Sequence, residues 1–439
     1  MFEPSGFRAA EVQFDKDAKV VASTQAVIDL ATDNNITDLV IVSHGWNNDI
    51  AGARDLYTKI AKSLRSVADA KAVPTLTGRG IGLAGLFWPS KKFSEYDLIP
   101  GGAAATASRI DPAEVERAIN DLRDVFTTSA HQAALDEARA LVPQLEDRAT
   151  ARKQFATALL SVLDRAAAER EDATTDMFEI SPGTLMDRLA VPAIIAPPEP
   201  NRGGATGIGV DAERRGGPGG AAGLGSTLGG ALGAAKNLLI HISYYEMKAR
   251  AGTVGERGLA PLIKQIRDKR SDLRIHLVGH SFGGRLVTAA ASQLPKGSLA
   301  TMTLLQAAFS HHGFAAEWSP GQAGGFRSTV TNNTVSGSLL ITHTANDRAV
   351  GIAYALASRI AGQNASAVGD ANDIYGGIGR NGAQKTAEAT FGQLLDVSGP
   401  YTWKARALHN LLADAFIKSH SDITNKQVAY ATLSAIAST

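Results

Sequence analysis

The chain of 439 residues contains no cysteine, which excludes disulfide bonds, a thiolate nucleophile and cysteine-based metal sites. It also lacks an excess of charge of either sign, because 44 Lys and Arg residues against 43 Asp and Glu residues give a formal net charge of +1. Domains that bind nucleic acid usually carry a basic excess. The composition therefore predicts no nucleic-acid partner, and the missing cysteine decides nothing about the compartment.

Long hydrophobic runs are missing as well. No run reaches the roughly 18 apolar residues that a membrane-spanning helix needs, so we expect no transmembrane segment. The first eight residues, Met1–Arg8, have neither the basic start nor the apolar stretch of a signal peptide. We expect a soluble, cytoplasmic protein, unless a signal peptide was removed beforehand. The sequence leaves the oligomeric state open.

Residues 1–92 alternate between strand and helix patterns. The short apolar run Asp38–Ser43 is typical of a strand that is buried on both faces. Asp49 is placed to cap a following helix, and Ile81–Trp88 is the next expected strand. This βαβ order predicts an α/β fold with a mostly parallel central sheet flanked by helices.

Residues 93–235 interrupt that order. Asp111–Ala168 is rich in Ala, Glu, Arg and Leu, which predicts two or three amphipathic helices. The stretch Gly203–Gly233 is dense in glycine, which loses much conformational entropy on ordering and offers few side chains for burial. We predict that 93–235 forms a helical, cap-like insertion, with the glycine-rich stretch as its tether and a side domain as the alternative.

The α/β pattern returns in residues 236–439, so that the core is expected in two parts, 1–92 and 236–439. Helices are expected at Leu259–Lys269 and Gly283–Leu294. The expected strands are Leu273–Val278, Thr301–Ala308, Ser338–Thr342 and Ala413–Lys418.

The motif Gly279-His280-Ser281-Phe282-Gly283 lies between an expected strand and an expected helix. A G-x-S-x-G sequence gains meaning in that setting, because the serine occupies a tight turn that lifts its Oγ above the sheet edge. The flanking glycines fit the crowding around the turn. In this motif and its setting the chain resembles the α/β-hydrolase superfamily of serine esterases and lipases, over residues of about 7–90 and 237–439.

The resemblance implies an oxyanion hole made by two backbone N–H groups. One belongs to Phe282, which follows the nucleophile. The other is expected after the early strand, where His44-Gly45-Trp46 resembles the oxyanion loop of the superfamily and Trp46 is the expected donor. Gly45 would let the backbone pass close to substrate, and we interpret His44 as a structural hydrogen-bonding residue.

The superfamily's chain order of Ser, acid and His leads to the acid. Asp347 lies in the turn after the strand-like sequence at 339–344 and is the expected acid, although an aspartate there can also simply cap a helix. Asp370 and Asp373 lie in a polar loop and are weaker candidates.

Two histidines lie far enough downstream to serve as the base. His420 directly follows the strand expected at Ala413–Lys418, where the superfamily delivers its histidine. His409 precedes that strand, so we expect it to cap or pack.

The resemblance therefore implies a carboxylic-ester hydrolase with an acyl-serine intermediate and a small-molecule or lipid-like ester as substrate. A lipase or phospholipase, an amidase or a thioesterase would use the same triad. A non-catalytic binding protein with this fold is an alternative of another class. Nothing in the sequence indicates a metal or other cofactor. His311 and His312 are adjacent but lack further residues at ligand spacing, so we expect them to line the cleft or lie on the surface.

Overall fold

The computed structural model describes residues 2, 4–46, 48–90, 110–192, 194–195, 229–363, 367–368 and 371–439. Within them, nine strands form one sheet in the order β10-β11-β8-β7-β6-β3-β4-β1-β2, and only the β1–β2 pair is antiparallel. The predicted α/β fold with a mostly parallel central sheet is confirmed. The strands are β1 (Arg8–Phe14), β2 (Val20–Ala22), β3 (Asp38–Ser43), β4 (Ile81–Phe87), β6 (Arg274–His280), β7 (Thr301–Leu305), β8 (Leu339–His343), β10 (Ala389–Gln393) and β11 (Leu408–Leu412).

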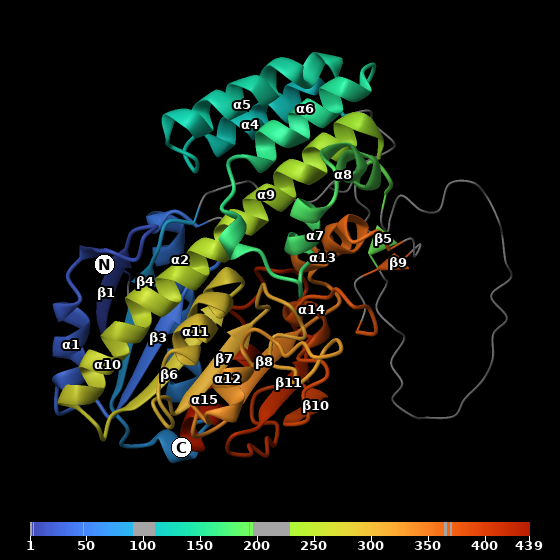
Figure 1. The fold of residues 1–439 in the computed structure, drawn as a ribbon. Coiled ribbons are helices and arrows are strands. Elements are labelled where there is room, and N and C mark those ends of the chain that lie inside the picture. Colours follow the sequence, from blue (N-terminus) through green and yellow to red (C-terminus); the bar gives the residue numbers. More distant parts are fainter. Residues whose placement is uncertain are drawn as a thin grey trace, which may run out of the picture.

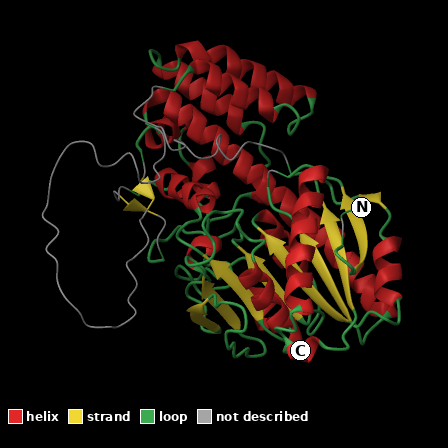
Figure 2. Ribbon diagram, turned by 180° about the vertical axis from the view of Figure 1, so that it is seen from behind, coloured by secondary structure: helices red, strands yellow, loops and turns green. Residues whose placement is uncertain are grey.

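Helices cover both faces of this sheet (Figures 1 and 2). Alternate residues of β3 show the two faces, because Leu39 and Ile41 belong to one hydrophobic cluster and Val40 and Val42 to the other. One face is covered by α2 (Ile50–Asp69) and α15 (Lys426–Ala437). The other is covered by α1 (Gln25–Thr32), α10 (Ala260–Lys269) and α11 (Phe282–Ser292).

A group of helices stands beyond one end of the sheet (Figure 1). It is joined to the core by α9 (Gly230–Val254), which continues through a π-helical turn at Gly255–Leu259 into α10. The boundary predicted at 235/236 therefore falls inside one helix. The group consists of α4 (Pro112–Leu122), α5 (Ser129–Leu141), α6 (Ala149–Leu160), α7 (Thr174–Glu179) and α8 (Pro182–Leu189).

Three further helices and a small separate sheet belong to the described part of the chain. α12 (Arg327–Thr331) and α14 (Ile378–Asn381) are short, whereas α13 (Arg348–Ile360) follows β8 and is almost entirely buried. A separate parallel pair joins β5 (Ile194–Ile195) to β9 (Ala367–Val368). Most of the glycine-rich stretch, 203–228, lies outside the described residues, as does the whole of 91–109.

The strand predicted at Ala413–Lys418 was wrong. The chain turns there instead, since the Ala413 carbonyl accepts hydrogen bonds from the N–H groups of Phe416 at 3.0 Å and Ile417 at 2.8 Å. The strand itself, β11, lies just upstream and pairs with both β8 and β10. The apolar Ile417 misled the prediction, because it is buried by a turn rather than by a strand.

The helices in the described part of the chain include none that is both long enough and apolar enough to cross a lipid bilayer.

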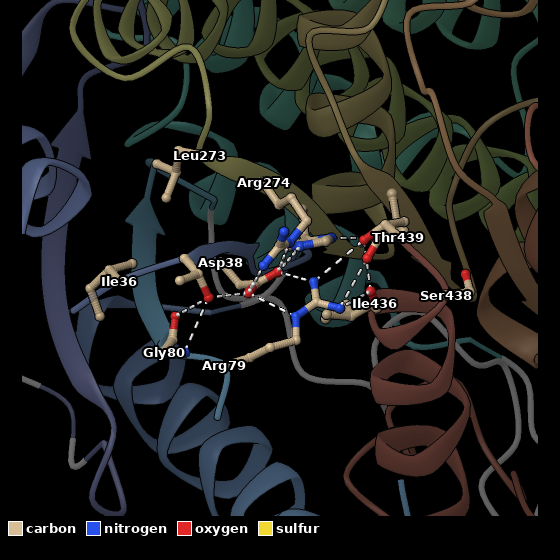
Figure 3. Close-up of polar contacts among 12 residues, drawn as sticks. Ile36, Asp38, Arg79, Gly80, Leu273, Arg274, Ile436, Ser438 and Thr439 are labelled. Carbon is tan, nitrogen blue, oxygen red and sulfur yellow. Dashed lines mark hydrogen bonds and ion pairs between the residues drawn. The ribbon is translucent and has the colours of Figure 1, made fainter. Parts of the chain in front are cut away.

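The starts of three neighbouring strands are tied together by the carboxylate of Asp38, which is fully buried (Figure 3). Asp38 begins β3, Arg79 lies two residues before the start of β4, and Arg274 begins β6. The Arg274 guanidinium donates to Asp38 at 2.9 and 3.0 Å, and Arg79 Nε donates at 2.9 Å. His276 Nε2 lies 3.0 Å from the same carboxylate. Figure 3 shows Arg79 reaching from Asp38 to Thr439 at the end of α15.

These contacts keep Asp38 ionised. Burial by itself would raise the pKa of Asp38, but hydrogen bonds from His276 and the two arginines outweigh it and hold the pKa far below its usual range. An aspartate whose pKa is depressed by folding stabilises the protein above its unfolded pKa of about 4. That contribution is lost progressively as the pH falls from there toward the folded pKa.

We predict that Asp38→Ala lowers the free energy of unfolding by about 3–5 kcal/mol, because it leaves two arginines without their buried partner. Equilibrium unfolding in urea at pH 7 measures the change. Asp55→Ala is the control, since Asp55 pairs with Lys59 on the exposed side of α2 and its loss should cost less than about 1 kcal/mol. Equal effects of the two substitutions would contradict the role given to Asp38.

Candidate active site

Ser281 occupies the turn between β6 and α11 with a positive φ, its φ being 56° and its ψ −124°. Such a backbone is strained for a residue with a side chain and persists only where the surroundings hold it. Two hydrogen bonds to the segment that begins in β7 do so. Ser281 N–H donates to the Leu305 carbonyl at 3.0 Å, and the Ser281 carbonyl accepts from Ala308 N–H at 3.0 Å.

The glycines of the motif are required by close backbone contacts. A β-carbon on Gly279 would lie 2.4 Å from the Gly283 carbonyl oxygen, and one on Gly283 would lie 2.3 Å from the Ser43 carbonyl oxygen. At Gly284 it would meet the Ala307 β-carbon at 2.5 Å. The motif thus lets the start of α11 pack directly against the ends of β3 and β7.

Asp347 lies at the first turn of α13, and its side chain makes two contacts. One carboxylate oxygen, Oδ1, accepts a hydrogen bond from Val350 N–H at 3.0 Å and so caps the helix. The other, Oδ2, lies 2.8 Å from His420 Nδ1. Asp347 is fully buried, so this histidine contact is shielded from water. The side chain therefore serves as a helix cap and also orients an imidazole.

His420 lies in the loop after β11 and is held by a second histidine. His280 Nε2 lies 2.9 Å from the His420 carbonyl oxygen, and the two rings are 4.9 Å apart between centroids. Burial lowers the pKa of His280 to about 3, so this ring is neutral at ordinary pH. A neutral ring can still donate one N–H to the carbonyl. His280 thus anchors a loop that no strand supports directly.

Ser281 and His420 line the same pocket, whose volume is about 340 Å³. Its walls are largely apolar. The lining residues also include Trp46 and Phe282, whose rings are 5.9 Å apart between centroids. The structure thus brings four of the predicted site residues to one cavity, with Asp347 behind His420.

Comparisons with protein families, with curated proteins and with solved structures gave no match to this chain.

Gly45 passes immediately beside the candidate nucleophile. A β-carbon on Gly45 would lie 2.4 Å from Ser281 Cβ and 3.1 Å from its Oγ. The neighbouring His44 is buried, and its ring stacks on Trp88 with 5.6 Å between centroids. His44 Nε2 accepts a hydrogen bond from Trp88 N–H at 3.3 Å, and Nδ1 lies 2.9 Å from the Gly45 carbonyl. These contacts fix the path of the loop.

The pKa of His44 supports a structural interpretation. Burial lowers it to about 4, although the hydrogen bond to the Gly45 carbonyl partly opposes the effect. Both ring nitrogens already have backbone partners, so the neutral ring stabilises the conformation of the loop.

The weaker candidates lie elsewhere. His409 is inside β11, packs on the Trp403 ring and accepts a hydrogen bond from Lys404 N–H at 3.1 Å. Asp370 falls outside the described residues. Asp373 is described and forms a backbone hydrogen bond with His311. Neither His409 nor Asp373 lines the pocket of Ser281.

The expectation for His311 and His312 was wrong, because both are buried rather than on the surface, and neither lines the pocket of Ser281. His311 Nδ1 lies 3.1 Å from Asn381 Nδ2, and His312 stacks on Trp318. Within the described ranges, no group of three or more His, Cys, Asp or Glu residues is arranged to hold a metal ion.

Several pocket residues were not predicted from the sequence. Ile240 and Tyr244 come from α9, and Arg348 and Val350 come from α13. None of the described lining residues comes from Asp111–Ala168, the helices that were expected to cover Ser281. Figure 1 shows α9 between those helices and the sheet. The proline-free run at 230–254 is compatible with a helix, but nothing in the sequence indicated that this helix approaches the site.

We predict that Gly45→Ala lowers the free energy of unfolding by about 1–3 kcal/mol, because its β-carbon forces Gly45 and Ser281 apart. Urea unfolding provides the measurement. Gly52→Ala is the matched control on α2, where the nearest atom to a new β-carbon is an Asp49 oxygen at 3.3 Å. Alanine in a helix should leave the stability unchanged or raise it by up to about 1 kcal/mol. Wild-type stability of Gly45→Ala would show that the loop can move freely.

Proposed function

We propose that this protein is a serine hydrolase of the α/β-hydrolase type that cleaves carboxylic esters, with Ser281 as nucleophile, His420 as base and Asp347 as acid. The observation that carries the proposal is the positive φ of Ser281 in a strand–turn–helix, where this serine lines one pocket with a histidine whose Nδ1 lies 2.8 Å from a buried aspartate. The three residues also follow the chain order of that superfamily.

In the proposed reaction, Ser281 Oγ attacks the ester carbonyl carbon while His420 Nε2 accepts the hydroxyl proton. Asp347 keeps the proton of the neutral imidazole on Nδ1 and stabilises the imidazolium ion that forms. The carbon–oxygen bond to the leaving alcohol then breaks, and His420 returns the proton to that oxygen. Water, deprotonated by His420, attacks the acyl-serine and releases the acid and the free Ser281 hydroxyl.

The negative charge that develops on the carbonyl oxygen needs fixed donors. Phe282 is the first residue of α11, so its N–H has no acceptor within that helix. We assign it as one donor and Trp46 N–H as the other, since Trp46 follows Gly45, which passes directly beside the Ser281 side chain. The positive end of the α11 dipole favours the same charge.

The pocket favours small or medium-sized esters. Its volume of about 340 Å³ and its apolar walls, which include Ile240, Val350 and Ile352, fit a short acyl or alcohol group. Amides and thioesters are cleaved by the same serine chemistry, so amide and thioester substrates are assayed alongside the esters. A lipase would show a preference for long acyl chains, which a panel of 4-nitrophenyl esters resolves.

We predict that a fluorophosphonate probe labels the wild-type protein at Ser281 and that Ser281→Ala abolishes both labelling and ester hydrolysis. The hydroxyl oxygen forms the covalent bond, so the loss of turnover should be about 10⁴-fold or more. Mass spectrometry locates the label, and circular dichroism verifies the fold of the variant. A folded wild-type protein that neither reacts with the probe nor turns over any ester would indicate a binding protein instead.

The acid is tested by Asp347→Asn, which we expect to lower kcat by about 10³-fold or more. Asparagine caps a helix as well as aspartate does, so the start of α13 is preserved while the charge facing His420 is lost. Asp373→Asn is the control, because Asp373 lies outside the pocket, and its kcat should stay within about threefold of wild type. The reverse result would transfer the role of acid to Asp373.

A further inference from the structure

The charged side chains in the described lining of the Ser281 pocket are all positive. Its described lining includes Arg348 and Lys418 but no aspartate or glutamate. The nearest catalytic carboxylate, that of Asp347, is already engaged by His420 and Val350 N–H. Two cations in a mostly apolar cavity create a site with positive potential, which attracts an anionic ligand.

Arg348 carries a donor that the protein leaves unused. It is the first residue of α13, and its Nε atom is inaccessible to solvent and has no hydrogen-bond acceptor among the described residues. The described chain also places no carboxylate within ion-pair distance of it. Because no carboxylate of the described chain neutralises this guanidinium, an anionic ligand in the pocket that Arg348 lines can supply the missing partner.

Lys418 also lines the pocket, but its ammonium group already has a hydrogen-bond acceptor. Its Nζ donates to the backbone carbonyl of Asp414 at 2.8 Å. The Asp414 carboxylate instead accepts hydrogen bonds from Thr344 Oγ1 at 2.7 Å and Ala345 N–H at 3.0 Å. The positive charge of Lys418 is thus not neutralised by Asp414, and it adds to the field that Arg348 creates.

We propose that the ester cleaved at Ser281 carries an anionic group, a carboxylate or a phosphate, that Arg348 binds. This inference rests on the proposed esterase function and names its substrate class. A guanidinium donates two parallel N–H groups to either anion, whereas an ammonium offers a point charge. Arg348 and Ser281 line the same pocket, so the bound anion lies in the same cavity as the reacting ester.

The test compares kcat/KM for two pairs of esters that differ in one charge. Mono-4-nitrophenyl adipate and 4-nitrophenyl hexanoate place the charge on the acyl side. 4-Acetoxybenzoate and 4-methylphenyl acetate place it on the alcohol side. In at least one pair, Arg348→Gln should lower the ratio of anionic to neutral kcat/KM by about tenfold or more, because a charge-assisted contact is lost.

Two further variants control for side effects. Arg348→Lys retains the charge without the fork of donors and should restore part of the ratio. Arg148→Gln removes an arginine from the surface near α6, where its side chain contacts Gln144, and should leave both ratios at their wild-type values. A ratio that Arg348→Gln leaves unchanged in both pairs would overturn the inference while the esterase function stands. Absence of turnover for all four esters would instead overturn the esterase function.

Competitive inhibition distinguishes the two anions. Benzoate and phenylphosphonate, with neutral benzamide as reference, are tested against hydrolysis of 4-methylphenyl acetate. The anion that Arg348 recognises should inhibit the wild-type enzyme more strongly than benzamide does. That advantage should fall by about tenfold in Arg348→Gln. Inhibition by both anions that is equal to that of benzamide would contradict an anion site.

Discussion

The backbone of Ser281 keeps its positive φ because neighbouring segments pack closely around the turn. Gly45 approaches the Ser281 side chain, Gly283 lies against the Ser43 carbonyl, and Gly284 lies against Ala307. Each contact is closer than a residue with a β-carbon would allow. The ends of β3, β6 and β7 therefore converge on one point, and the pocket forms around it. Strain at this turn is sustained by the packing of the sheet rather than by the turn itself.

Two buried aspartates show how surroundings decide the use of one chemical group. Asp38 begins β3 and is surrounded by donors from Arg79, Arg274 and His276, so its charge is consumed in joining three strands. Asp347 lies beyond the carboxyl end of β8, and among the described residues its one side-chain partner is His420. A carboxylate whose two oxygens both accept hydrogen bonds from arginines is not available to interact with a catalytic base. One that faces a single imidazole can respond to a proton arriving there, which is the basis of the role proposed for it.

The helix α9 connects the helical group to the site. Almost all of its residues between Leu232 and Val254 are buried, because α4, α6 and α8 pack on one side and α11 on the other. Tyr244 illustrates the connection, since its ring lines the pocket and lies 5.0 Å from the Phe282 ring between centroids. Among the described residues, α4, α5 and α6 contribute no side chain to the pocket lining, and α9 lies between them and the sheet.

The local sequence determined the features that depend on neighbours along the chain. The alternation of apolar runs and helical faces predicted the parallel sheet, and Gly279-His280-Ser281-Phe282-Gly283 predicted a strand–turn–helix. Contacts between distant segments were decided by the tertiary structure alone. The sequence could not show that His280 holds the His420 loop or that Arg348 faces the pocket. It also misplaced the last strand, because apolar residues such as Ile417 are buried equally well by a turn. The hydrophobic pattern of a sequence indicates which residues are buried. Which segment covers them is decided only when the whole chain has folded.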